Sequence, residues 1–92
     1  MKVFVVYEEK NWDSEEYADV VNVYSDKEKA VAELKELKDQ FLQENEELIK
    51  ELTTEKVYKG MLDMTDKDTY FQCLDNGMGH NYELWVIEKE LI

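Results

Sequence analysis

Side chains that commonly act in catalysis are scarce in this chain, which has one histidine, His80, and one cysteine, Cys73. Nucleophilic and acid–base catalysis both need a group that is activated by a second one, and neither residue lies in such a signature. Cys73 lies in the apolar stretch 70–74, which predicts a small buried side chain rather than a reactive thiol. His80 follows Gly77-Met78-Gly79, which lacks the lysine and the following helix of a phosphate loop, so we expect an exposed loop histidine. These observations argue against an enzyme and predict no cofactor.

Asp63, Asp66 and Asp68 form the cluster most like a metal site, because calcium loops use oxygen ligands at alternating positions. The segment lacks the glycine and the distal glutamate of such a loop. A solvated acidic turn is therefore the prediction, and no metal is expected. The alternative function is a small-ligand or metal-binding module that combines this turn with the loop 75–81.

The segment 8–19 combines six acids with two amphipathic aromatic residues, Trp12 and Tyr17. No periodicity is visible from residue 9 to residue 17, which predicts a loop. Aromatic side chains that a core does not need are enriched at interfaces, and an acidic rim around them steers a basic partner. We therefore predict a partner-binding surface anchored by Trp12 and Tyr17. The alternative is a solvated loop whose Trp12 folds back as a lid on the end of the sheet. The candidate contact residues here are Glu9, Trp12, Asp13, Glu15, Glu16, Tyr17 and Asp19.

A second acidic surface is predicted on the outer face and C-terminal end of the expected helix. Duplex DNA carries one charge per about 1.7 Å of its axis, so a rigid body studded with carboxylates can compete for a nucleic-acid cleft as a DNA mimic. The alternative is an ordinary salt-bridged helix surface, because lysines 27, 29, 35, 38 and 50 alternate with the acids. The candidate contacts are Glu44, Glu46 and Glu47, with Glu33, Glu36, Asp39 and Glu51 in the same surface.

The charge balance excludes several classes of partner. The 92 residues carry a formal charge of −12, from 23 acids and 11 bases, and every base is a lysine. Arginine is the side chain best suited to phosphates and guanine edges, so its absence and the acidity argue against direct nucleic-acid binding. The same charge argues against an anionic membrane surface, and no apolar N-terminal run resembles a signal peptide or a membrane span. With a single cysteine, no intramolecular disulfide is possible, and we expect a cytoplasmic protein.

The stretch 25–52 predicts the helix around which the chain is organised. Ser25 and Glu28 fit a capping box, so the helix is expected to start at Asp26. Apolar residues then recur at steps of three and four but lapse from residue 43 to residue 47. An unbroken helix would be roughly 40 Å long against strands of about 20 Å, so we expect a bend or break at 43–46. The alternative is a straight helix whose end forms a homodimer contact through Leu48, Ile49 and Leu52.

The expected strands are 2–8, 19–24, 56–64, 69–74 and 82–88, with a turn at 65–68 and a hairpin loop at 75–81. The first strand is near-continuously apolar, which predicts a central strand buried on both faces or nearly so. The first two strands form an antiparallel pair with a long connection, and the centre of the last strand, 84–87, lies beside the first. Length and the lack of linker-like segments predict one compact domain, 1–92. The fold class is α+β, ββαβββ, with one antiparallel or mixed sheet and one long helix, with or without a kink, across one face.

Two short strands lead into Val-Tyr-Ser-Asp-Lys-Glu-Lys-Ala at 23–30, which opens the helix, and Tyr-Glu-Leu-Trp-Val-Ile-Glu at 82–88 returns as the last strand. This arrangement resembles small proteins of phages and Gram-positive bacteria, among which some anti-CRISPR proteins are equally small, acidic and free of catalytic motifs. The resemblance implies a phage or mobile-element inhibitor that acts in the cytoplasm of a bacterial host. Its target would be a basic nucleic-acid-binding surface of a host enzyme such as a CRISPR effector. The resemblance implies no site residues.

Overall fold

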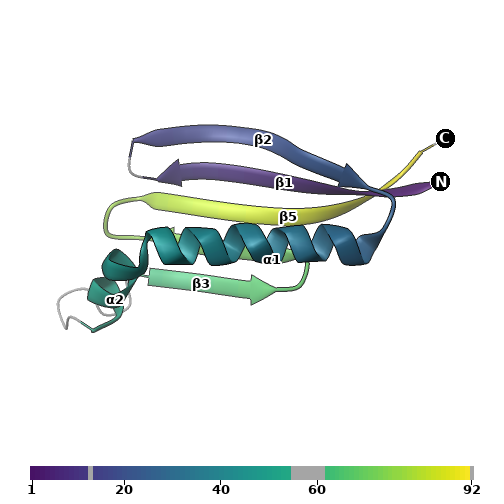
Figure 1. Cartoon of the computed structure of the whole chain (residues 1–92). Coiled ribbons are helices and arrows are strands. Elements are labelled where there is room, and N and C mark those ends of the chain that lie inside the picture. The colour runs from purple at the N-terminus through teal and green to yellow at the C-terminus, as the bar shows by residue number, and fades with distance from the viewer. Residues whose placement is uncertain (13, 55–61, 92) are drawn as a thin grey trace.

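The computed structural model describes residues 1–12, 14–54 and 62–91 of the chain. Two strands come first, β1 (Lys2–Trp12) and β2 (Glu15–Tyr24), followed by two helices, α1 (Lys27–Glu44) and α2 (Glu46–Thr54). Three strands complete the described part of the chain: β3 (Leu62–Lys67), β4 (Tyr70–Asp75) and β5 (His80–Glu90). The predicted α+β class, with the helical region between two and three strands, is confirmed (Figure 1).

The described strands form one five-stranded sheet in the order β2-β1-β5-β4-β3, and every neighbouring pair is antiparallel. The prediction of an antiparallel or mixed sheet therefore resolves to an antiparallel one. β1 and β5 are the first and last strands of the chain, and they lie side by side with Val5 opposite Ile87. The expected pairing of the last strand with the first is confirmed, and β1 has a neighbour on each side.

The predicted loop 9–17 is wrong. β1 continues to Trp12 and β2 begins at Glu15, so that Trp12 and Glu15 are directly paired across a tight hairpin. Ser14 has a φ of 72°, the left-handed conformation that such a short turn requires. Both strands were predicted, but their extensions toward the hairpin were not, because nearly all of β2 is exposed and exposed strand positions need no apolar side chain.

The C-terminal strands fall close to their expected positions. β4 and β5 are confirmed with shifted ends, and the loop between them covers only residues 76–79. β3 runs from Leu62 to Lys67, so the turn expected at 65–68 is wrong for its first residues. Most of the strand expected at 56–64 lies outside the described residues.

α1 begins one residue later than predicted, because its cap is Asp26 rather than Ser25. The Asp26 carboxylate accepts the backbone N–H of Glu28 at 2.9 Å, which satisfies one of the free donors of the first turn. The break expected at 43–46 is confirmed: α1 ends at Glu44, with Asn45 as its C-cap, and α2 starts at Glu46. The chain therefore has two helices rather than one long one.

The break also changes the setting of the predicted dimer contact. The alternative prediction of one straight helix, which would have carried Leu48 and Ile49 away from the sheet, is wrong. Both side chains are partly buried against the core of their own chain instead. The side chain of Leu52 lies outside the described part of the structure.

α1 packs across one face of the sheet (Figure 1), and the core lies between them. Leu34 and Phe41 of α1 are buried with Phe71 of β4 and Leu84 of β5, and the ring of Phe41 stacks on Tyr82 with centroids 4.1 Å apart. Burial of such side chains is the main favourable contribution to folding. None of the described helices covers the other face of the sheet, where Val3, Val5 and Tyr7 of β1 are partly buried, so β1 is less buried on that face than predicted.

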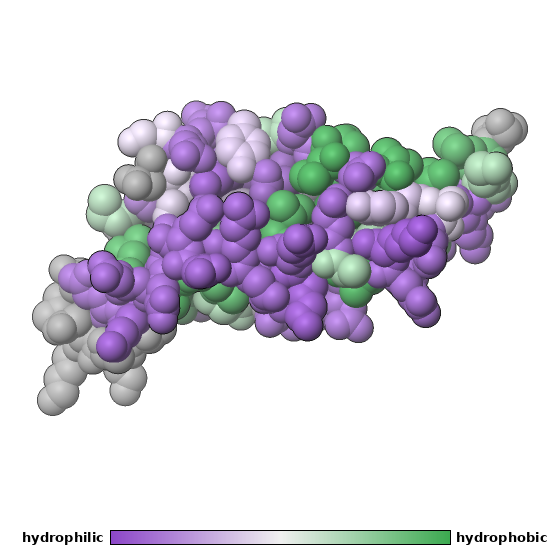
Figure 2. Space-filling model, in the orientation of Figure 1, coloured by the Kyte–Doolittle hydropathy of each residue, from purple (hydrophilic) through white to green (hydrophobic). Residues whose placement is uncertain are grey.

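The molecule is elongated, with dimensions of 51 × 22 × 19 Å. At one end the two termini meet, where the N–H of Leu91 donates to the carbonyl of Met1 at 2.7 Å. The β1–β2 hairpin, the α1–α2 junction and the β4–β5 turn gather at the opposite end, on the left of Figure 1. The face that carries α1 is largely hydrophilic (Figure 2).

Candidate functional site

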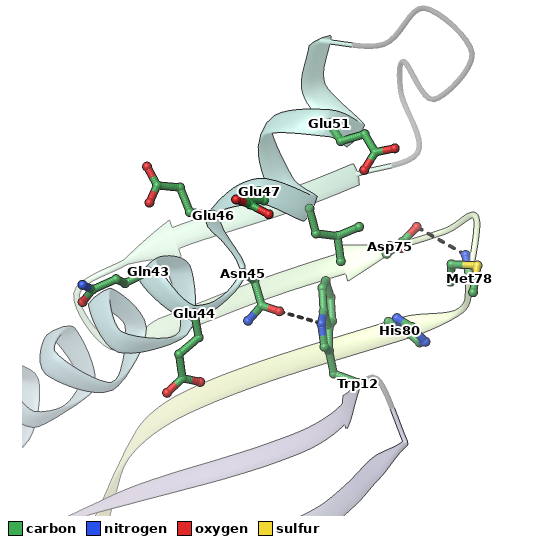
Figure 3. A pocket seen from close by; sticks show the side chains of 11 residues that line it. Trp12, Gln43, Glu44, Asn45, Glu46, Glu47, Glu51, Asp75, Met78 and His80 are labelled. Carbon is green, nitrogen blue, oxygen red and sulfur yellow. Dashed lines mark hydrogen bonds between the residues drawn. The ribbon is translucent and has the colours of Figure 1, made fainter.

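Trp12 occupies the centre of the end where the hairpin and the helix junction meet (Figure 3). Its indole is only 2% exposed, and its Nε1–H donates to the side-chain oxygen of Asn45 at 3.1 Å. The ring meets Phe41 edge-on, with centroids 5.1 Å apart, and lies 5.3 Å from His80. Trp12 is therefore folded back on the sheet end, as the alternative expected of its side chain, but from the end of a strand and not from a solvated loop. So buried a side chain offers little contact area, and its predicted role as an anchor stays a prediction.

A hollow of about 800 Å³ opens beside Trp12 (Figure 3). Its walls come from the end of β1, the α1–α2 junction and the β4–β5 hairpin. This places Trp12 and three predicted acids of the helix end, Glu44, Glu46 and Glu47, around one cavity. The lining residues are Trp12, Gln43, Glu44, Asn45, Glu46, Glu47, Leu48, Glu51, Asp75, Met78 and His80.

The rim of the hollow is acidic, and the ion pairs of Lys2, Lys10 and Lys38 join acids outside it, Glu88, Glu15 and Asp66. Glu46 and Glu47 lie in the first turn of α2, where the helix dipole favours negative charge. The expectation that all three acids crowd a helix C-terminus is correct only for Glu44. A local excess of carboxylates therefore faces solvent at this end of the molecule.

Two buried polar atoms of the hollow have no hydrogen-bond partner among the described residues: Oδ2 of Asp75 and Nδ1 of His80. Asp75 is completely buried, and its other oxygen accepts the backbone N–H groups of Gly77 (3.0 Å) and Met78 (3.3 Å). His80 is the first residue of β5 and is directly paired with Asp75, so the prediction of an exposed loop histidine is wrong. The sequence pointed to Asp75 only as part of the loop 75–81 of the alternative function, because one acid among 23 has no distinguishing mark.

Tyr17 lies at a smaller groove of about 240 Å³ on the helix side of the sheet, together with Glu8, Lys10 and Glu44. The hydroxyl of Tyr82 donates to the carboxylate of Glu8 inside this groove. Burial, followed by the nearby Glu8 carboxylate, raises the pKa of both Tyr17 and Tyr82. Tyr17 is 41% exposed at this groove, which adjoins the hollow at Glu44, and its contact role stays a prediction.

The remaining predicted contacts spread over the two faces of the hairpin. Glu9 and Glu16 are exposed and, by strand alternation, point to the face without the helix. Asp19 is paired with Glu8 on the helix side, and Glu15 forms an ion pair with Lys10 at 3.0 Å. Asp13 lies outside the described residues.

The helical acidic surface does not behave as an ordinary salt-bridged helix. Within the described residues, no ion pair joins two side chains of α1, and Lys38 pairs with Asp66 of β3 instead, at 3.0 Å. Glu33 accepts the hydroxyl of Tyr24 at 2.9 Å. The alternative in which lysines neutralise the acids of the same helix is wrong for α1.

The open face of the sheet is a feature that the sequence reasoning missed. The aromatic side chains of Tyr7, Trp85 and Tyr70 form a row across β1, β5 and β4, with centroid distances of 5.2 and 5.7 Å. Val20 and Val23 of the edge strand β2 are about half exposed beside them. The alternation of residues 3, 5 and 7 with 85 and 87 was the signal available in the sequence.

Two of the three acids of the predicted acidic turn have side-chain partners. Asp66 holds Lys38, and Asp63 accepts the side-chain N–H of Asn76 at 2.9 Å. In the part of the chain that the structure describes, no group of three or more histidine, cysteine or acidic side chains is arranged to hold a metal ion. Cys73 is completely buried, as expected from its apolar neighbours.

None of the described helices has the length and apolar character needed to cross a membrane. A scan against models of protein families and searches of curated proteins and of solved structures found no match. The function must therefore be argued from the geometry of the chain itself.

Proposed function

We propose that this chain is a non-enzymatic interaction protein that occupies a basic, nucleic-acid-binding surface of another protein. The observation that carries the proposal is the acidic end of the molecule. Carboxylates of Glu44, Glu46, Glu47 and Glu51 surround one hollow, and the ion pairs that Lys2, Lys10 and Lys38 form go to acids elsewhere. A surface that concentrates carboxylates attracts a partner surface that concentrates positive charge.

Rigidity of the acidic end strengthens the electrostatic argument. Trp12 ties the hairpin to the helix break through its hydrogen bond to Asn45, and Phe41 packs against the same indole. The carboxylates of the junction are therefore displayed on a supported scaffold. Preorganised charges need little ordering on binding, which leaves more of their attraction as affinity.

The buried position of Trp12 changes the expected contact surface. Its role becomes support of the acidic end, while Met78, which is 71% exposed at the hollow, and Tyr17 at the adjoining groove provide apolar contact area. The partner would be a nucleic-acid-processing protein whose phosphate-binding groups meet the carboxylates. An inhibitor of the anti-CRISPR type, encoded by a phage or mobile element, is the form of this proposal that the resemblance implies.

The test is a pull-down with the tagged full chain from a bacterial lysate that contains CRISPR–Cas and restriction systems. Glu46→Lys combined with Glu47→Lys reverses charge at the hollow. Glu88→Lys combined with Glu90→Lys makes the same change in net charge on β5, toward the end where the termini meet, at exposed side chains whose ion pairs contribute little. We expect wild type and the β5 variant to capture a nucleic-acid-binding protein that the hollow variant does not.

Salt dependence gives the second arm of this test. Affinity for the captured protein should fall steeply as ionic strength rises, because exposed charges are screened beyond about 10 Å at 0.1 M salt. An affinity that is the same in low and high salt would contradict the proposal. Equal losses from the two pairs of charge reversals would contradict the assignment to the acidic end.

A further inference from the structure

The hollow contains more than an acidic rim, since two buried acceptors point to a ligand. Asp75 is completely buried, and its Oδ2 has no hydrogen-bond partner among the described residues. Nδ1 of the paired residue His80 is buried and unpartnered in the same way. Leaving such groups unsatisfied costs free energy, and a buried carboxylate without a cation is the more expensive of the two. Both residues line the hollow, so the fold carries an unfavourable arrangement beside a cavity, with both atoms covered in the unbound chain.

The chemistry of the hollow favours a cation that also donates hydrogen bonds. The carboxylates of Glu47 and Glu51 add negative charge at its rim, and none of the described residues that line it is a lysine. The described residues offer no convergent set of three metal-binding side chains, which disfavours a bare metal ion. An organic cation can instead satisfy two acceptors that are too few for a metal.

We propose that the hollow receives an arginine side chain of the partner protein, with its guanidinium donating to Asp75 Oδ2 and His80 Nδ1. The inference rests on the proposed function and names the partner's contacting group. Directly paired residues on neighbouring strands have Cβ atoms about 5 Å apart, a spacing that suits the several donors of one guanidinium. The group is planar, weakly hydrated and able to stack on aromatic rings, which suits a cavity beside the indole of Trp12 and the ring of His80 better than a strongly hydrated ammonium does.

The test is an NMR titration of the ¹⁵N-labelled full chain with N-acetyl-arginine methylamide. N-acetyl-lysine methylamide and MgCl₂ serve as separate arms at matched ionic strength. The indole N–H of Trp12 and the amides of Met78 and His80 report on the hollow, whereas the indole of Trp85 on the open face is an internal control. We expect saturable shifts confined to the hollow with the arginine probe, and weaker binding of the lysine probe.

Asp75→Asn should weaken arginine binding by about tenfold or more, because it removes the charged partner of a buried pair. The asparagine oxygen can still accept the N–H groups of Gly77 and Met78, so the turn should persist. His80→Leu provides a second variant that removes the whole imidazole, both the Nδ1 acceptor and the ring beside Trp12, and should also weaken binding. Glu36→Gln, on α1 and outside the hollow, is the matched control and should bind like wild type.

Shifts of equal size with all three probes, spread over the acidic surface, would overturn the inference, as would a hollow that responds to Mg²⁺ and not to arginine. Binding to Asp75→Asn as tight as to wild type would overturn it too. The two proposals fail separately. Capture of a basic partner by wild type without any response to the arginine probe leaves the proposed function standing and removes the arginine site.

Discussion

Trp12 and Asn45 are 33 positions apart in the chain, and the indole Nε1–H of the first donates to the side-chain oxygen of the second at 3.1 Å. The amide nitrogen of Asn45 donates in turn to the carbonyl of Phe41 at 2.9 Å, so one side chain both ends α1 and holds the indole. The helix break and the end of β1 are thereby coupled. The acidic junction stands where it does because of this one residue.

Asn45→Ala should lower the free energy of unfolding by about 1–3 kcal/mol, because the indole N–H loses its acceptor and the helix end loses its cap. Urea denaturation followed by circular dichroism measures the change. Gln43→Ala, an exposed neighbour in the same turn, is the control and should be within about 0.5 kcal/mol of wild type. Equal stability of the two variants would show that the hydrogen bond does not hold the junction.

Glu44 lies at the C-terminal end of α1, where the helix dipole disfavours a negative charge and no basic residue occupies the last turn. Glu44→Gln should therefore raise the free energy of unfolding by about 0.3–1 kcal/mol at low salt, with a smaller gain in 1 M salt. Glu28→Gln, in the first turn of the same helix, should have the opposite sign. A destabilised Glu44→Gln would mean that the carboxylate has a favourable contact in the fold. If Glu44→Gln is more stable than wild type, as expected, Glu44 costs stability, which agrees with a role in binding.

Much of the fold could be predicted, because its helix and central strands bury residues with clear periods. The apolar stripe through Leu34 and Phe41 and its lapse before α2 gave the helix and its break. The run around Leu84 identified the strand that pairs with β1. These signals are local. They arise because buried positions of a helix or strand hold apolar residues at the period of that element.

The site was harder to predict, since its decisive features are not local. Trp12 looked like a surface aromatic among acids, and its burial follows from tertiary contacts with Phe41, Asn45 and His80. Asp75 becomes a candidate site residue only because it is paired with His80 and because its Oδ2 has no hydrogen-bond partner among the described residues. A strand such as β2, exposed along almost all of its length, gives no hydrophobic signal for its start. The sequence therefore indicated the acids but not the cavity that gathers three of them.

Alanine substitutions of Phe41 and Val20 test which face of the sheet carries the core. Phe41→Ala removes a ring that stacks on Tyr82 and meets Trp12, and should cost about 3–5 kcal/mol of unfolding free energy. Val20 is 49% exposed on β2, and Val20→Ala should cost less than about 0.5 kcal/mol. Chemical denaturation of both variants gives the comparison. A large cost for Val20→Ala would show that the open face is covered in solution, for example by a second copy of the chain.

The thiol of Cys73 should be unreactive in the folded protein. Its raised pKa should also lower the free energy of unfolding of the protein in alkaline solution. Burial, followed by the nearby carboxylate of Asp75, raises the pKa of the thiol from 9.0 to about 11. At pH 8 iodoacetamide should therefore alkylate Cys73 far more slowly in the native chain than in urea. Above pH 9 the unfolded chain releases the proton first, so this group makes unfolding easier as the pH rises toward 11.

The decrease in the free energy of unfolding that Cys73 causes has an upper limit of about 1.4 kcal/mol per pH unit, because one proton is released. Cys73→Ala removes this contribution, and its unfolding free energy should depend less on pH between 9 and 10 than that of wild type. Tyr70, whose pKa burial and the hydrogen bond to Glu83 raise to about 12, adds its own loss only above pH 10 in both proteins. Identical slopes for the two proteins between pH 9 and 10, or rapid native alkylation, would mean that the thiol is not enclosed between the sheet and α1.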